Sequence, residues 1–173
     1  MHPRAAEFAA LARERYGFDP DVREFPEGTR TAADAAAAIG CDVAAIASSL
    51  VFRVVRPDGA SADAGGDDGD RVVVAVTSGA NRVDEARLAA HLGVEAVEMA
   101  DAEGVRDATG WAIGGVPPFA HERDPRVLLD PTLAEREAVW AAAGTPAAVF
   151  PVAPDRLREF ADAAVVDVTE RDD

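Results

Sequence analysis

The sequence predicts an α+β domain around a mixed sheet, and three observations favour this fold class. Short runs of β-branched and aromatic residues, typical of strands, alternate with alanine-rich segments whose apolar residues recur at helical spacing. Their order has no regular strand–helix–strand rhythm, which argues against a doubly wound α/β protein. The chain has 173 residues, 49% of them hydrophobic, and can bury one core. Residues 1–173 are therefore predicted to form a single domain.

The first elements are predicted from periodicity and from the residues that end them. Apolar positions at helical spacing predict a helix over residues 5–16, and Gly17 ends it. A short strand over 22–25 closes at Pro26. The alanine-rich segment 32–39 is predicted to be a helix, because a threonine hydroxyl just before it can cap its free N–H groups.

The next two strands are predicted over 50–55 and 72–77, where β-branched and aromatic residues dominate, and they are expected to pair. Residues 57–70 between them hold no apolar side chain larger than alanine, so burial cannot offset the entropy of ordering them. A mobile acidic hairpin loop is predicted there. Calcium ligation is the alternative for its aspartates Asp63, Asp67, Asp68 and Asp70, but the EF-hand spacing and closing glutamate are missing.

The C-terminal half continues with helices and short strands. Asp101 is expected to cap a helix over 102–109, and helical periodicity predicts further helices over 81–92 and 154–161. The predicted strands, which share β-branched or aromatic residues, lie at 126–129 and near Val139, Val149 and Val165.

The charge balance constrains the partners. The chain has 17 basic and 32 acidic residues, a net charge of −15, and every basic residue is an arginine. A GC-rich genome together with a salt-rich cytoplasm accounts for this composition. A strongly negative protein binds the phosphate backbone of nucleic acids weakly, so no DNA partner is predicted. In molar salt, however, the Debye length falls to about 3 Å, which weakens the same objection for tRNA.

The sequence shows no signal for a membrane span, a secretion signal, a reactive cysteine or a metal site. No apolar run approaches the ~20 residues of a membrane span, and the start lacks a signal peptide's apolar block, so a cytoplasmic protein with no membrane partner is predicted. The single Cys41 lies in an apolar neighbourhood, which favours a small buried filler. The three histidines, His2, His91 and His121, lack the paired spacing of zinc ligands, so no metal site is expected.

Two loops rich in glycine and proline point to a ligand pocket. GGVPPFAH runs from Gly114 to His121, and GTPAAVF runs from Gly144 to Phe150. Their bare backbone N–H groups could form two walls of one cleft and donate to a carbonyl oxygen. His121 beside the first loop is predicted to be partly exposed and to touch the ligand.

A serine hydrolase is an alternative interpretation, since Ser49 or Ser78 could join His121 and Asp130. The Ser78-Gly79 pair lacks the glycine pattern of a nucleophile elbow, and nothing in the sequence sets the required geometry. This alternative predicts cleavage of simple esters by Ser49, and it ranks last.

Six blocks of the chain resemble the YbaK/ProX family of trans-editing aminoacyl-tRNA deacylases, which are related to the insertion domain of bacterial prolyl-tRNA synthetase. In order, the blocks are FPEGTRTAADAAAAIG (Phe25 to Gly40), IASSLVF (Ile46 to Phe52), SGANRVDEARLAAHLG (Ser78 to Gly93), ATGWAIGGVPPFAH (Ala108 to His121), VLLD (Val127 to Asp130) and WAAAGTPAAVF (Trp140 to Phe150). Each block is weak alone, but six in sequence are specific.

The resemblance implies a mostly antiparallel sheet surrounded by helices and an activity that hydrolyses the ester of mischarged tRNA, typically proline tRNA carrying alanine or cysteine. The expected partners are the 3′ end of an aminoacyl-tRNA and, as a second candidate, prolyl-tRNA synthetase. Since the ester is labile, positioning a water and stabilising an oxyanion suffice, and no cofactor is expected.

The resemblance also assigns site residues. The catalytic residues it implies are Ser48, Gly114, Gly115 and His121. The substrate-binding residues it implies are Phe25, Arg30, Thr31, Ser49, Pro117, Asp130, Gly144 and Thr145.

One position departs from the family pattern. The family carries a lysine, usually needed for activity, where this chain has Ser48, so a charged contact to the substrate is lost. Arg30, Arg53 or Arg82 could supply a cation from another direction. The alternative function is therefore a non-catalytic module that binds an aminoacyl-tRNA end or a small ligand.

Overall fold

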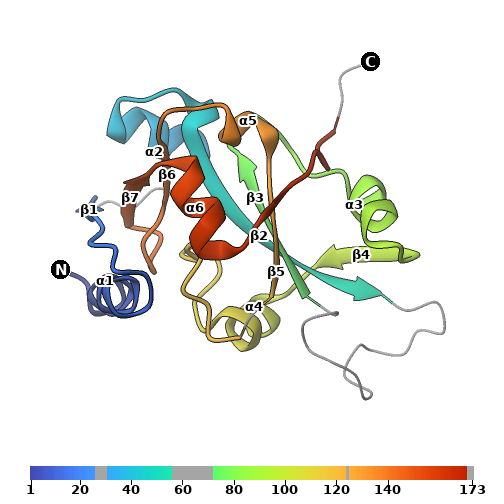
Figure 1. Ribbon diagram of the computed structural model, residues 1–173, viewed down its shortest axis with the longest axis horizontal. Helices are drawn as coiled ribbons and strands as arrows, with labels where there is room; N and C mark the ends of the chain where they lie inside the picture. The colour runs from blue at the N-terminus through green and yellow to red at the C-terminus, as the bar shows by residue number, and fades with distance from the viewer. Residues whose placement is uncertain (26–30, 56–71, 124, 171–173) are drawn as a thin grey trace.

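The computed structural model describes residues 1–25, 31–55, 72–123 and 125–170, and its elements form one sheet with helices packed around it (Figure 1). The strands are β1 (Arg23–Glu24), β2 (Ile46–Val55), β3 (Val72–Ser78), β4 (Ala96–Met99), β5 (Arg126–Leu129), β6 (Val139–Ala142), β7 (Ala148–Val152) and β8 (Ala164–Val165). The helices are α1 (Pro3–Tyr16), α2 (Ala32–Ile39), α3 (Glu85–Leu92), α4 (Ala102–Thr109), α5 (Pro131–Ala134) and α6 (Pro154–Ala161), with a 3₁₀ turn at Val43–Ala45. The acidic loop predicted at 57–70 lies outside the described residues.

The sheet runs in the order β1-β7-β6-β2-β3-β5-β8, and β4 adds to β2 beyond the end of β6. The pairs β1·β7, β6·β7, β2·β3 and β2·β4 are antiparallel. The pairs β2·β6, β3·β5 and β5·β8 are parallel. The predicted α+β fold with a mixed, mostly antiparallel sheet is therefore confirmed.

Apolar clusters cover the faces of the sheet. The largest joins α1, α4 and α6 to the central strands, and Phe8, Phe119 and Phe150 meet in it with ring centroids 4.8 to 5.8 Å apart. A second cluster packs α3 through Leu88 against Phe52. A third holds α2 against Ile46. Burial of apolar surface on these faces is the main force that holds the domain together.

Local signals at helix ends explain why several boundaries match their predictions. The helices over 32–39, 102–109 and 154–161 have the predicted bounds. The Thr31 hydroxyl accepts from Asp34 N at the start of α2, and the Asp101 carboxylate accepts from Gly104 N at the start of α4. The predicted pairing of β2 with β3 is confirmed over seven residue pairs.

Other boundaries were predicted wrongly. The strand β2 begins at Ile46 and not at residue 50, since Ile46 and Ala47 gain a partner in β6. Helix α3 begins at Glu85 and not at residue 81, because Asp84 is its cap. Helix α5 and strand β4 were not predicted. Strand β4 is only four residues long, and its pairing partner on β2 is more than 40 residues away in sequence.

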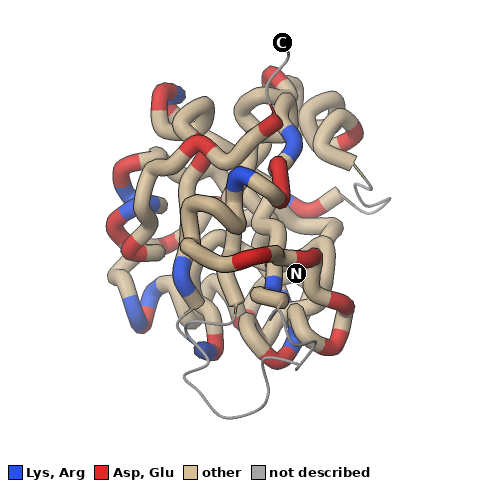
Figure 2. The backbone as a smooth tube through the Cα atoms, turned by 90° about the vertical axis from the view of Figure 1, so that its right-hand side faces the viewer, with Lys and Arg blue, Asp and Glu red and all other residues tan. Residues whose placement is uncertain are grey.

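Charged residues are spread over the surface. In Figure 2 acidic positions occur across the visible face, with basic positions between them. Among the described residues, no helix is both long enough and apolar enough to cross a bilayer.

Candidate functional site

A cavity of about 250 Å³ lies at one edge of β2, between the ends of β6 and β4. Four segments far apart in the sequence meet there: the start of α2, the middle of β2, the loop after α4 and the β6–β7 hairpin. The residues that line it are Thr31, Ala32, Ala35, Ile46, Ala47, Ser48, Ser49, Leu50, Val51, Met99, Ala100, Val105, Ile113, Gly114, Val116, Trp140, Ala141, Ala142, Pro146 and Val149.

The register of β2 explains why the cavity exists. On one side β2 pairs with β3 from Ala47 to Arg53 without interruption. On the other side its pairing with β6 ends at Ala47, and its pairing with β4 begins at Phe52. Among the described residues, no strand lies opposite the edge between these two strands, and the cavity occupies this gap.

The two glycine loops touch each other directly and lie on the same side of the cavity, where two separate walls were expected from the sequence. A Cβ atom on Gly115 would lie 2.7 Å from Thr145 Cα, so only glycine permits this backbone approach. Gly144 has a φ of 93°, and a Cβ atom there would lie 2.8 Å from the Trp111 ring. The glycines of these loops thus shape the wall by bringing backbones together.

The polar content of the cavity is small. Three hydroxyl residues, Thr31, Ser48 and Ser49, lie among mostly apolar side chains, and none of the described lining residues is ionisable. The Oγ of Ser49 is buried and has no hydrogen-bond partner within the described part of the chain. A buried hydroxyl without a partner costs free energy, which a ligand with a matching group can recover.

The N–H groups of the two glycines in the first loop differ in how they are used. The Gly115 N–H donates to Ala112 O at 2.9 Å and closes a turn, so it is already used. Gly114 lines the cavity, and its N–H has no acceptor among the residues that the structure describes. An oxyanion in this cavity would therefore meet the Gly114 amide before that of Gly115.

Apolar side chains surround the mouth. Met99 and Ile113 line the cavity and are 54% and 51% exposed, unusually high for large apolar side chains. Trp140 also lines it, and the guanidinium carbon of Arg23 lies 4.9 Å from the centroid of the Trp140 ring. This arginine, which also pairs with Asp21 at 3.5 Å, places a guanidinium beside an aromatic surface of a cavity whose described lining is uncharged.

The structure brings together four of the predicted site residues. Ser48 and Gly114, predicted to be catalytic, and Thr31 and Ser49, predicted to bind substrate, all line the cavity. Arg30 lies outside the described residues. The others do not line the cavity; they are Phe25, Gly115, Pro117, His121, Asp130, Gly144 and Thr145.

His121 is buried behind the first loop, and its expected partial exposure was wrong. It is 7% exposed, and its Nε2 lies 2.8 Å from the Pro117 carbonyl oxygen. The imidazole ring thereby joins the end of the loop at His121 to its middle at Pro117. Pro117, which was predicted to bind substrate, is buried as well.

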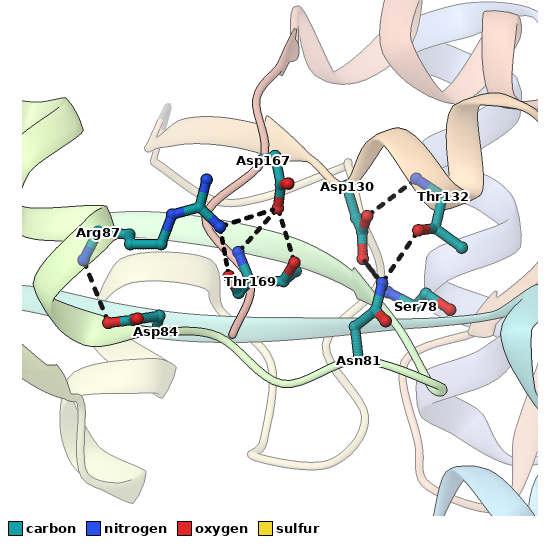
Figure 3. A network of polar contacts seen from close by, with 8 residues as sticks. All are labelled: Ser78, Asn81, Asp84, Arg87, Asp130, Thr132, Asp167 and Thr169. Atoms are coloured by element: carbon teal, nitrogen blue, oxygen red, sulfur yellow. Dashed lines mark hydrogen bonds and ion pairs between the residues drawn. The ribbon is translucent and has the colours of Figure 1, made fainter. Parts of the chain in front are cut away.

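Asp130 is placed in a structural network (Figure 3). Its carboxylate accepts from Ser78 N at 3.0 Å, from Asn81 Nδ2 at 2.9 Å and from Thr132 N at 2.9 Å. It therefore caps α5 and holds the end of β3. The Ser78 hydroxyl in turn donates to Ala44 O. These partners do not form the serine–histidine–aspartate geometry of the alternative hydrolase.

Two of the three arginines proposed to replace the family lysine, Arg53 and Arg82, are described, and they lie elsewhere. Arg53 pairs with Glu98 on the neighbouring strand β4. Arg82 is exposed, and its carbonyl accepts from Glu170 N near the C-terminus. Neither lines the cavity.

Cys41 is half-buried, not fully buried, and packs against the cluster that holds α2. Burial raises the pKa of its thiol, because the thiolate loses hydration there, and Arg136 opposes the shift only in part. The thiol is thus less reactive than an exposed one, as a filler role requires.

Sequence reasoning missed Trp140, Met99 and Ile113 at the mouth and Arg23 beside it. Trp140 and Ile113 stand within blocks that the family resemblance includes, so they could have been found by asking which large apolar residues flank the glycines. Met99 gave no signal, because its strand was not predicted.

Fold and cavity together define an α+β domain with a small apolar ligand pocket at an open strand edge. The model of the aminoacyl-tRNA editing domain matches residues 26–160, and the chain belongs to this family. The resemblance to trans-editing deacylases is thereby confirmed, and membership supports a deacylase-like role in tRNA editing.

Individual proteins agree with this assignment. The chain is 33% identical over 140 residues to the uncharacterized protein YwhH of Bacillus subtilis (strain 168), covering 81% of this chain and 80% of that protein. A crystal structure described as a candidate trans-editing enzyme for prolyl tRNA synthetase is 35% identical, with a TM-score of 0.84 over 99% of both chains. A hypothetical protein, APE2540, is 28% identical with a TM-score of 0.76, over 96% of this chain and 99% of its own.

Proposed function

We propose that this protein hydrolyses, in trans, the ester between a wrong amino acid and the 3′ end of a tRNA, with mischarged proline tRNA as its substrate. The observation that carries the proposal is the meeting of the two glycine loops and the Ser48 strand around one cavity. The similar candidate trans-editing enzyme for prolyl tRNA synthetase supports the choice of tRNA.

The cavity favours a short, uncharged amino acid side chain. Its volume is about 250 Å³, and its described lining offers no charge to neutralise an acidic or basic side chain. Burying an unpaired charge there would cost several kcal/mol. The proposed substrates are therefore tRNAs that carry a small residue in place of the cognate amino acid.

Catalysis in such a site depends on position and not on a side-chain base. No described lining residue can exchange a proton near neutral pH. The Gly114 N–H would stabilise the negative charge that develops on the ester carbonyl oxygen. A water held near the carbonyl, helped by the substrate's own ribose hydroxyl, would attack it.

The second candidate function rests on Ser48. This residue lines the cavity where the family resemblance places a lysine, and neither Arg53 nor Arg82 supplies a cation there. A chain without this charge could bind the acylated end of a tRNA without cleaving it, as a non-catalytic module.

A deacylation assay at high salt with proline tRNA mischarged with alanine tests both candidate functions. We expect slow hydrolysis by the wild type over the uncatalysed rate, and a rate higher by about 10²–10³ in Ser48→Lys, because one electrostatic partner is commonly worth that much. Ser48→Ala is the matched control, which should resemble the wild type.

The outcomes separate the two functions. A silent wild type with an active Ser48→Lys variant would assign the native chain to binding alone. If both are silent and neither binds the acylated tRNA end, the proposed substrate is wrong. Correctly charged prolyl-tRNA in the same assay shows whether hydrolysis depends on the amino acid.

A further inference from the structure

We infer that the open edge of β2 at Ser49 recognises the amino acid part of the substrate by pairing with its amino and carbonyl groups, as one residue of an added strand would. This inference rests on the proposed function and names the groups that the site reads. It requires a substrate with a free α-amino group.

The direction of the Ser49 backbone follows from the ladder with β3. Gly79 N donates to Ile46 O, so Ile46 faces β3 with its backbone hydrogen-bonding groups. In an antiparallel ladder this alternates with every residue, and Ser49 therefore turns its N–H and C=O to the opposite edge. Val51 confirms the alternation, because its carbonyl accepts from Ala100 N on that edge.

The gap on that edge is one residue wide. On its N-terminal side, β6 pairs with β2 as far as Ala47. On its C-terminal side, the Ala100 N–H donates to the carbonyl oxygen of Val51. Ser49 is the single outward-facing position between them. The cavity lies at this position, and both Ser49 and its neighbours line it.

An aminoacyl group matches such a gap chemically. In an antiparallel hydrogen-bonded pair, one residue offers its N–H to the opposite C=O and its C=O to the opposite N–H. The amino and carbonyl groups of an esterified amino acid have the same spacing. The amino group would donate to Ser49 O, and the carbonyl would accept from Ser49 N.

The Ser49 side chain is a second, independent sign that a polar ligand group comes here. Its buried Oγ has no partner in the part of the chain described, although it lies at the cavity. Side chains alternate along the strand, so this hydroxyl shares the face of Ala47 and Val51, while Ser48 points to the other face. Ser48 and Ser49 thus meet the ligand from different sides.

The closed ends of the gap exclude a blocked amino group. An acyl group on the amino nitrogen would extend along the strand edge toward the next outward position, which β6 or Ala100 already occupies. The site should therefore reject N-acylated and peptidyl substrates.

Three uncleavable ligands test the inference by calorimetric titration of the wild type. Each is 3′-amino-3′-deoxyadenosine joined through an amide to an alanyl, a propionyl or an N-acetylalanyl group. We expect the alanyl compound to bind at least about tenfold more tightly than the propionyl compound, because one charge-assisted hydrogen bond is lost. The N-acetylalanyl compound should bind more weakly than the alanyl compound as well.

Ser49→Ala is the matched control, since it removes the hydroxyl and keeps the backbone groups. The ratio between alanyl and propionyl affinities should persist in this variant. If the alanyl and propionyl compounds bind Ser49→Ala equally well, the amino group contacts the hydroxyl and backbone pairing is wrong. Equal affinities of the two compounds for the wild type would also overturn the inference. If none of the three compounds binds, the proposed function itself fails.

Discussion

Gly115 lies at the contact of two loops, where a Cβ atom would come within 2.7 Å of Thr145 Cα and 2.9 Å of Thr145 N. The atoms in the way are backbone, so they cannot rotate aside. The second glycine of the pair therefore admits the neighbouring loop and not the ligand itself. The wall of the cavity is therefore expected to depend on this contact.

Gly115→Ala is expected to separate the loops and enlarge or distort the cavity. Overpacking of this kind costs about 1–3 kcal/mol, which urea unfolding would measure. Affinity for the alanyl compound should fall at temperatures where the variant remains folded.

Gly93→Ala controls for loss of stability alone. Gly93 has a φ of 72°, and no atom lies within 4 Å of its added Cβ, so alanine there strains only the end of α3. It should lower stability without changing ligand affinity. Normal affinity in Gly115→Ala would show that the loop contact does not shape the pocket.

At the scale of the elements, the side chain of one predicted site residue, Asp130, holds the ends of a helix and a strand. Asp130 was predicted to bind substrate, yet its carboxylate caps α5 and accepts from the end of β3 (Figure 3). It is 5% exposed and faces these donors from within the protein. Its physical role in the structure is to join two elements.

Asp130→Ala is expected to destabilise the fold by about 2 kcal/mol or more, because a helix cap is lost and buried N–H groups keep no acceptor. Asp130→Asn should recover part of this, since an amide oxygen can still accept from Thr132 N. Thermal and urea unfolding would measure both changes.

Binding of the alanyl compound distinguishes the structural role from a substrate contact. The folded Asp130→Ala variant should keep its affinity. Loss of affinity with unchanged stability would instead restore the predicted contact between Asp130 and the substrate.

The whole molecule carries a net charge of −15. The ion pairs recorded among described residues join mostly exposed side chains, such as Arg13 and Asp19 at 3.4 Å, and contribute little. Repulsion between surface carboxylates is therefore expected to destabilise the folded state at low ionic strength.

Salt should stabilise the protein. Raising NaCl from about 0.02 to about 0.5 M shortens the Debye length severalfold, so we expect the melting temperature to rise over this range and to level off above it. Differential scanning calorimetry would measure the rise. A melting temperature that stays flat would show that self-repulsion does not limit stability.

Choline chloride at equal ionic strength is the control for specific ion effects. Screening depends on ionic strength and not on the cation, so both salts should give the same rise. A rise with NaCl alone would assign the effect to sodium binding.

Short-range signals made much of the fold predictable. Helices α2, α4 and α6 have their predicted bounds because capping residues and glycines act on their nearest neighbours in the chain. The two glycine loops were also predicted to face one cleft, and the family resemblance placed Ser48 in the same site; residues of both loops and Ser48 line one cavity.

Other features depend on contacts between distant segments. The early start of β2, the existence of β4 and the gap between β6 and β4 all follow from strand register, which no local pattern specifies. Ser48 and Ser49 point to opposite faces of β2 because consecutive side chains of a strand alternate. Asp130 and His121 are buried for a different reason, because each contacts protein groups of its own, the Ser78 and Thr132 N–H groups for Asp130 and the Pro117 carbonyl for His121.

Composition, caps and ordered blocks were enough to predict an editing-domain fold and the segments that enclose its site. The identity of the groups that line the cavity was decided by packing, because a side chain's surroundings depend on which strand or loop from a distant part of the chain lies against it. Ser49 and Trp140 line the cavity, and Arg23 contacts the Trp140 ring, because of such long-range neighbours.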